Sequence, residues 1–124
     1  MIESQTELQI GLGTLEPEKG GLKPAKVKIV SASVESTPKA KKVSFLVKHP
    51  DRDEPVKLSS IAYLDGREVR IVGTWLNLDP EGKIQKGSGL YVFLNRLKVA
   101  NIQETIGLEV ETELDEKYLV FKCY

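Results

Sequence analysis

The chain has 124 residues, 40% of them hydrophobic and 29% charged, which is the size and composition of one globular domain. No run approaches the roughly 18 apolar residues of a membrane span, and the first residues lack the basic and apolar regions of a signal peptide. The formal net charge is zero, which argues against a strong nucleic-acid binder. The single cysteine, Cys123, cannot form an internal disulfide, so we expect a cytoplasmic protein.

The charges are unevenly distributed along the chain. Residues 1–18 carry four glutamates and no basic residue, residues 19–57 carry ten basic and four acidic residues, and residues 100–124 carry six acidic and two basic residues. A basic middle allows one basic face on a neutral protein, although the same charges would also serve simply to solvate strand surfaces. Methionine, cysteine and asparagine are scarce, and lysine and glutamate dominate the charges, a profile that leans toward a thermophile.

The N-terminal part of the chain divides into an arm and the start of a domain. Residues 1–24 contain six glycines and prolines that interrupt any period, which indicates a flexible or extended arm before a domain over 25–124. Alternating apolar residues predict strands over 25–35 and 41–48. The apolar face of the first strand changes near Ile29-Val30, as in a strand that bends through a bulge.

Two further strand-like runs form a predicted hairpin. The runs 56–64 and 67–78 flank Asp65-Gly66, a dipeptide that favours a type I′ turn with positive φ at both central positions. Gly73 interrupts the second run. The backbone at this glycine decides whether Trp75 lies in the core or on the surface.

One amphipathic helix is predicted over residues 88–98, with Ser88 as its N-cap. Four apolar residues follow the cap at helical spacing: Leu90, Phe93, Leu94 and Leu97. Residues 101–104 then have the residue types of a short helical turn with a capping box. Residues 108–114 and 118–124 alternate as the two strands of a final hairpin.

This order of elements predicts a mainly β fold. We expect an OB-like barrel of five or six antiparallel strands, with one α-helix before the final hairpin. Leu90, Phe93 and Leu97 would close one end of that barrel. An open α+β sheet with the helix on one face is the alternative.

No catalytic or metal-binding motif is present in the sequence. His49 is the only histidine and lies in a charged loop, where we expect it to be solvated. One histidine and one cysteine far apart do not make a zinc site, and Cys123 is expected to be a small core residue. The segment 82–88 lacks the spacing of a phosphate-binding loop. We therefore expect no enzymatic activity and no cofactor.

Basic residues cluster at the turn between the first two predicted strands. Lys39, Lys41 and Lys42 lie there, in the loop that OB barrels use to hold single-stranded nucleic acid, and Lys26 and Lys28 would continue the basic track. Ordinary turn chemistry and protection of a strand edge explain the same lysines equally well.

Other candidate contacts come from the middle of the chain. Trp75 would stack on a base, unless it lies in the core, and Arg70 would contact a phosphate or a base. Lys83 and Lys86 precede the predicted helix, whose free N–H groups attract a phosphate. A solvated linker is the alternative reading of this segment.

Several short segments resemble the small single-stranded-DNA-binding OB domains of archaea and their viruses. These segments are Trp75–Asp79, Gly82–Ser88, Asn101–Gly107 and the final hairpin, so the resemblance covers about the C-terminal half. It implies a non-enzymatic barrel that binds single strands. The chain departs from this pattern in its acidic loop Asp115–Lys117, where such domains often bring basic or aromatic contacts.

Two functional hypotheses follow from the sequence. The first is non-enzymatic binding of single-stranded nucleic acid, which we expect to be DNA, through a basic face and aromatic stacking. The second is a protein-interaction or assembly module, which would use the N-terminal arm or the final strand, 118–124, to bind another protein or a second copy. Neither hypothesis involves a membrane.

Overall fold

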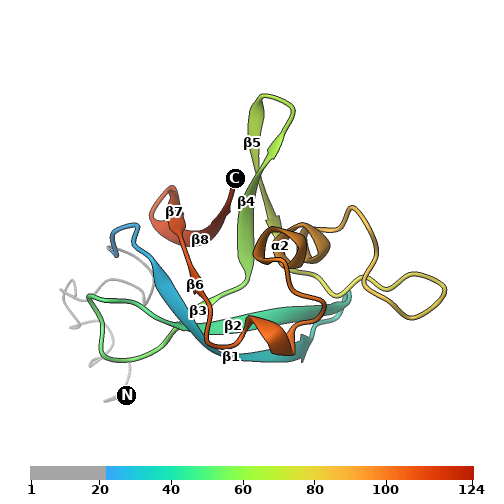
Figure 1. Ribbon diagram of the computed structural model, residues 1–124, viewed down its shortest axis with the longest axis horizontal. Coiled ribbons are helices and arrows are strands. Elements are labelled where there is room, and N and C mark those ends of the chain that lie inside the picture. The colour runs from blue at the N-terminus through green and yellow to red at the C-terminus, as the bar shows by residue number, and fades with distance from the viewer. Residues whose placement is uncertain (1–21) are drawn as a thin grey trace, which may run out of the picture.

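The computed structural model describes residues 22–124 (Figure 1). Most of the predicted arm, residues 1–24, therefore lies outside the described residues. Its last residues contact the domain, because Leu22 packs against the hydrophobic core and the carbonyl oxygen of Lys23 is 2.7 Å from His49 Nε2.

The described residues confirm a mainly β fold, with one α-helix between two groups of strands. The helix α2 spans Gly89–Leu97, and a short 3₁₀ helix, η1, spans Gln103–Thr105. The strands are β1 (Val27–Ser36), β2 (Lys41–Lys48), β3 (Val56–Leu58), β4 (Ser60–Asp65), β5 (Glu68–Gly73), β6 (Glu109–Val110), β7 (Thr112–Asp115) and β8 (Tyr118–Cys123).

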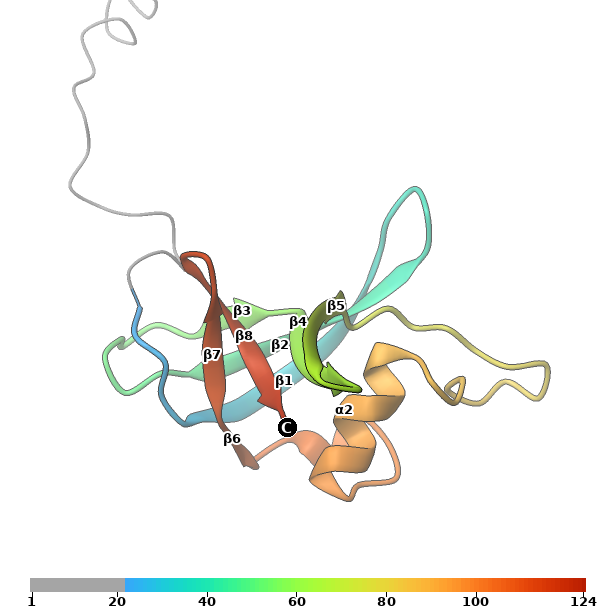
Figure 2. The same cartoon turned by 90° about the horizontal axis from the view of Figure 1, so that it is seen from above.

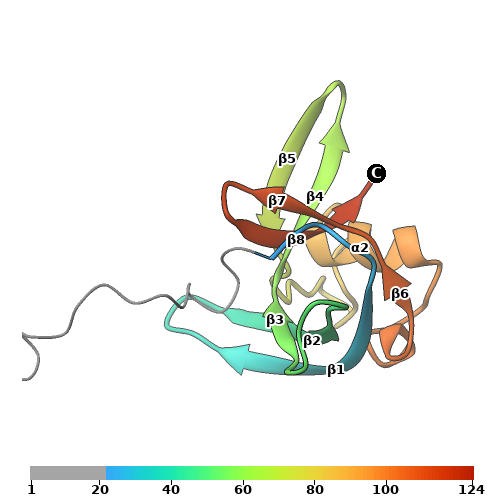
Figure 3. The same cartoon turned by 90° about the vertical axis from the view of Figure 1, so that its left-hand side faces the viewer.

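The strands form two four-stranded sheets that continue into each other. Their orders are β3-β2-β1-β6 and β5-β4-β8-β7. The chain passes directly from β3 to β4 through Ser59 and from β6 to β7 through Glu111, so one strand continues into the other sheet at each of these two residues. The strands therefore curl into a barrel-like structure around one core (Figure 3).

The predicted strand count and strand directions differ from those in the structure. The runs 56–64 and 108–114 each divide into two strands, so eight strands replace the predicted five or six. The pairing of β4 with β8 is parallel, which corrects the prediction that all strands are antiparallel. A parallel pair needs a long connection, which residues 66–117 supply, and no local pattern shows that the chain returns there.

The final strand has no free edge. β8 lies between β4 and β7 in its sheet and pairs with both of them. The predicted use of this strand for binding a partner required an open edge, so it does not apply to this structure. The end strand of that sheet is β5.

The predicted bulge in β1 and the predicted turn between β4 and β5 can be compared directly with the structure. The register between β1 and β2 shifts between Ile29 and Ser31, which confirms the predicted bulge. The loop between β4 and β5 is Gly66-Arg67, one residue later than predicted, because Asp65 pairs with Glu68. Only Gly66 has positive φ, +67°, as in a type II′ turn, so the prediction of two positive φ values is wrong.

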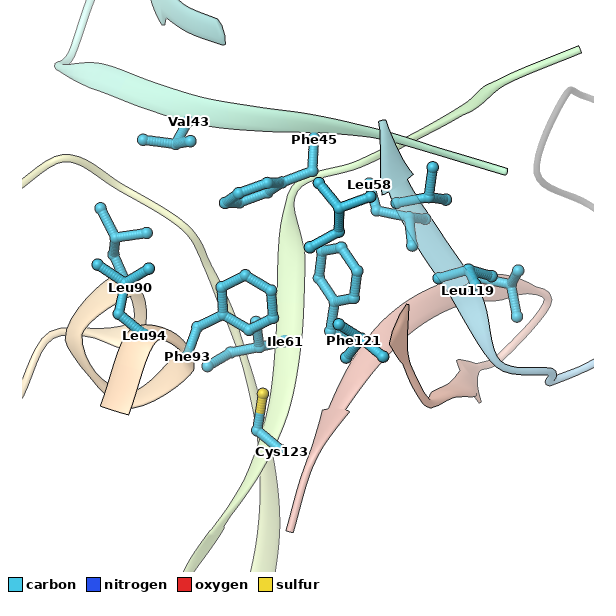
Figure 4. Packing of buried hydrophobic residues seen from close by; sticks show 14 of the residues in the cluster. Val43, Phe45, Leu58, Ile61, Leu90, Phe93, Leu94, Leu119, Phe121 and Cys123 are labelled. Carbon is cyan, nitrogen blue, oxygen red and sulfur yellow. The ribbon is translucent and has the colours of Figure 1, made fainter. Parts of the chain in front are cut away.

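Three phenylalanine rings form the centre of the core. Phe45 of β2 meets Phe93 of α2 edge to face at 5.1 Å between ring centroids, and Phe121 of β8 stacks on Phe93 at 4.6 Å (Figure 4). Leu90 and Leu94 are buried beside them, so α2 closes one side of the curled sheet with its apolar face. The cluster joins both sheets to the helix.

The starts of α2 and of the 3₁₀ helix η1 follow the predicted capping chemistry. The N-cap at Ser88 is confirmed, because its Oγ accepts the Tyr91 N–H at 3.2 Å. After the helix, Asn101 Oδ1 accepts the Glu104 N–H at 3.0 Å, and Glu104 Oε1 accepts the N–H of Ala100 at 2.8 Å. This is the predicted capping box, except that Glu104 accepts the N–H of Ala100 instead of the N–H of the capping residue Asn101.

The phenylalanine cluster gives a first testable prediction. Phe93→Ala should lower the free energy of unfolding by about 3–5 kcal/mol, because it leaves a cavity between the two other rings. Leu97→Ala, on the same helix but half-buried, should cost clearly less. Urea unfolding of both variants measures this difference, and an equal effect would show that the cluster is not the centre of the core.

Candidate nucleic-acid interface

Trp75 lies directly opposite Lys42 on the outside of the curled sheet. After β5 the chain leaves β4 and joins β2: the Val43 N–H donates to Thr74 O at 2.9 Å, and the Leu76 N–H donates to Lys41 O at 2.9 Å. Because Val43 is buried in the core, strand alternation places Lys42 on the outer face. The Lys42 Nζ lies 4.9 Å from the centroid of the Trp75 ring.

Gly73 permits this contact because it has no side chain. A Cβ at Gly73 would lie 2.8 Å from Trp75 Nε1, closer than side chains tolerate, and 3.0 Å from Lys42 Cε, so the indole and the lysine would have to shift. The next residue, Thr74, is fully buried, and its Oγ1 donates to Val43 O at 2.6 Å. Thr74 therefore points inward, and the half-buried Trp75 forms part of the surface.

The β1–β2 turn carries two more lysines, which are close to Lys42 along the chain. Lys39 and Lys41 are exposed, and Lys41 begins the strand that carries Lys42. Thr37 orders the turn, since its N–H donates to Ala40 O at 2.8 Å and its Oγ1 donates to the same oxygen at 2.7 Å. The turn projects from the body of the domain (Figure 2).

Lys42 and the turn residues Lys39 and Lys41 together form what we call the basic surface. One carboxylate, that of Glu35, lies beside Lys42 in it. Glu35 pairs with Lys42 across β1 and β2, and Lys57 Nζ is 2.8 Å from its carboxylate. Ser44 Oγ also donates to this carboxylate. The hydrogen bonds from Lys57 and then Ser44 lower the pKa of Glu35, so it carries a negative charge at neutral pH and offsets part of the basic surface.

The structure places Lys26 and Lys28 away from Lys39 and Lys41, at the opposite end of the β1–β2 ladder. Lys28 pairs with Glu109 of β6, and Lys26 lines a pocket that also contains Glu109. These two lysines therefore lie apart from the turn, in surroundings of mixed charge that include Glu109 and Arg96.

Arg70 forms ion pairs within the β4–β5 hairpin. Its Nε lies 2.6 Å from Asp65 and its Nη2 lies 3.5 Å from Glu68. It pairs across the hairpin with Tyr63, whereas Trp75 pairs with a residue of the other sheet. The structure therefore does not bring Arg70 and Trp75 together on one surface.

Lys83 and Lys86 are exposed on the ordered loop that follows Trp75. Asp79 holds this loop, because its Oδ1 accepts the N–H groups of Glu81 and Lys83, each at 2.9 Å. A pocket of about 620 Å³ lies between the loop and α2. Sequence reasoning missed this pocket, which is lined by Gly82, Lys83, Ile84, Tyr91, Leu94, Asn95, Val99 and Ala100.

His49 is fully buried, so the prediction that it is solvated is wrong. Its Nδ1 accepts the Asp51 N–H at 3.0 Å, which leaves Nε2 to donate to the carbonyl oxygen of Lys23 at 2.7 Å. Both ring nitrogens are therefore used to attach the residues before β1 to the loop after β2. No local pattern in the sequence indicates this role of His49, because the partner carbonyl is 26 residues away.

Among residues 22–124, no cluster of histidine, cysteine, aspartate and glutamate is suited to hold a metal ion, and no helix is long and apolar enough to cross a membrane. Comparison with protein-family models, curated proteins and solved structures found no match to this chain.

The buried thiol gives a prediction about pH. Burial raises the pKa of Cys123 from 9.0 to about 12, so above pH 9 unfolding releases a proton that the folded chain retains. This contribution to stability is complete below pH 9 and is lost as the pH rises toward 12, by up to about 1.4 kcal/mol per pH unit. Urea unfolding should show a steeper alkaline loss for the wild type than for Cys123→Ala. Identical pH profiles for the wild type and Cys123→Ala would show that the thiol makes no such contribution.

Proposed function

We propose that this chain is a non-enzymatic protein that binds single-stranded DNA on the outer face of an OB-like barrel. β3 and β4 continue each other across Ser59, and β6 and β7 do so across Glu111. When each of these pairs is counted as one strand and β5 is set aside as an added hairpin strand, the barrel has five strands. The helix precedes the final hairpin, as in that fold. In OB barrels, the second and third strands and the first turn bind oligonucleotides.

The observation that carries the proposal is the contact between Trp75 and Lys42. A half-exposed indole with a lysine at 4.9 Å offers a stacking surface and a positive charge at one place. A base would stack on the ring, and the flexible lysine would move from the ring face to the adjacent phosphate. Base stacking on an aromatic side chain is worth about 1–3 kcal/mol.

Exposed lysines on the adjoining turn and loop add positive charge for the backbone of the strand. Lys39 and Lys41 lie on the projecting β1–β2 turn, and Lys83 and Lys86 lie on the loop after Trp75. Exposed lysines act as point charges for phosphates without fixing a base sequence, so we expect binding that tolerates sequence and weakens with salt. The zero net charge and Glu35 keep the affinity modest.

Titration with a short oligothymidine tests the proposal directly, because Trp75 is the only tryptophan. Its fluorescence should be quenched at low salt, and added salt should reverse the quenching. No response up to roughly 100 µM, weaker than ordinary non-specific binding, would rule the function out.

The lysines of the turn can be tested against a matched pair. Lys39→Ala/Lys41→Ala should weaken binding and reduce the slope of log affinity against log salt by up to about 1.4, or about 0.7 for each lost phosphate contact. Lys26→Ala/Lys28→Ala removes the same charge at the other end of β1 and should change the slope far less. Equal slopes for the two double variants would remove the turn from the site.

Glu35 provides a prediction in the opposite direction. Glu35→Gln removes the negative charge paired with Lys42 and frees Lys57, so affinity for oligothymidine should increase several-fold at low salt. The gain should disappear at high salt, where charges are screened. Unchanged or weaker binding at low salt would show that the strand does not cross this part of the sheet.

A further inference from the structure

The β4–β5 hairpin projects from the barrel and leaves one strand edge open (Figures 1 and 3). β5 is the end strand of its sheet, and within residues 22–124 it pairs only with β4. One face of the hairpin is apolar, with Leu64 50% exposed, Val69 45% exposed and Ile71 41% exposed. The hairpin therefore combines free backbone groups with exposed apolar side chains.

The register of the hairpin shows which backbone groups are free. Asp65 and Glu68 flank the two-residue loop, and such a flanking pair exchanges hydrogen bonds across the hairpin. Bonded pairs recur at every second residue, so Arg70 also points its backbone groups toward β4. The N–H and C=O of Val69 and Ile71 therefore point to the open edge.

Apart from the charges of Glu68 and Arg70, nothing in β5 protects this edge. Natural edge strands are commonly blocked by lysine, proline or a bulge. The segment Glu68–Gly73 contains no lysine or proline, and its pairing with β4 is regular throughout. An edge of this kind is suited to pairing with another strand.

We propose that β5 pairs with β5 of a second copy of this chain, antiparallel and with Val69 opposite Val69. In this register the outward backbone groups of both Val69 residues meet each other. Glu68 of each copy lies opposite Arg70 of the other, which forms two identical pairs of opposite charge. The sequence of β5 is thus complementary to itself.

Neighbouring registers lack this match. Centring the pairing on Arg70 would set two arginines directly against each other, which is unfavourable. Centring it on Ile71 would place Arg70 opposite Val72 and leave its charge without a partner in the other copy. Charge complementarity therefore selects the register centred on Val69.

The same register extends the apolar face across the two copies. Leu64 pairs with Val69 within each hairpin. The two hairpins together would form a cross-strand row of Leu64, Val69, Val69 and Leu64. Neighbouring side chains in such a row cover one another, which removes apolar surface from water.

Charge exchange tests the dimer and its register. Glu68→Arg and Arg70→Glu should each weaken self-association, because each places like charges across the edge. A mixture of these two variants should form a heterodimer, and the double exchange should restore the homodimer. Sedimentation velocity of the full chain over a range of concentrations measures each case, with circular dichroism confirming that the variants fold.

Two outcomes of that experiment would overturn the proposal. One is a wild-type chain that remains monomeric at about 1 mM, where even contacts worth about 4 kcal/mol produce dimers. The other is a dimer that both single variants leave unchanged, which would show that a different surface joins the copies.

Cross-linking provides an independent test of the register. Val69→Cys should form a disulfide-linked dimer under mild oxidation, because directly opposite residues of a bonded pair have Cα atoms about 5.5 Å apart. Ile71→Cys is the matched control, since it would lie opposite Arg67 and should not cross-link. The wild type, with its buried Cys123, should also remain unlinked. Cross-linking through Ile71→Cys alone would contradict the register.

Discussion

After Gly73 the chain stops pairing with β4 and bonds to β2 instead. These hydrogen bonds to β2 determine both surfaces proposed for this protein. Residues 74–76 bond to the first residues of β2, with Thr74 inside and Trp75 outside. This transfer places the indole opposite Lys42. It also ends β5 at Gly73 and leaves its other edge open among the described residues. A side chain at residue 73 would displace the indole and the end of Lys42, so the glycine favours the contact as it stands.

The distribution of charge explains how a neutral chain can offer a basic surface. Strand β1 joins two different environments: its end near the turn leads to Lys39 and Lys41, and its other end pairs with Glu109. The basic surface is further limited by Glu35, which Lys57 and Ser44 hold in its ionised form. The basic surface and the acidic residue Glu109 are therefore separated by the length of β1, although the net charge of the chain is zero.

The parts of the fold that were predictable from sequence depend on short-range chemistry. The N-cap at Ser88, the bulge after Ile29 and the alternation of the final hairpin each depend on residues close together in the chain. The hairpin turn at Gly66 was misplaced by one residue, because the identity of a turn dipeptide does not fix its register.

The remaining features depend on partners that are distant in sequence. The parallel pairing of β4 with β8 joins segments about 60 residues apart, and the burial of His49 depends on the carbonyl of Lys23. Arg70 could be recognised as a charged strand residue, but its ion pair with Asp65 required the hairpin register. For the candidate site, the sequence supplied Trp75 and the turn lysines, and the structure showed which of them share a surface.

Nuclear magnetic resonance of the side chains tests the central claim most directly, because it observes the Trp75–Lys42 contact before and after a strand is added. In the free protein, the Lys42 methylene protons should be shifted upfield by the indole ring, and Trp75→Phe should reduce that shift. Adding oligothymidine should move the Lys42 and Trp75 Nε1–H resonances together in a saturable way. Resonances of both residues that stay fixed while those of other residues respond would contradict the account.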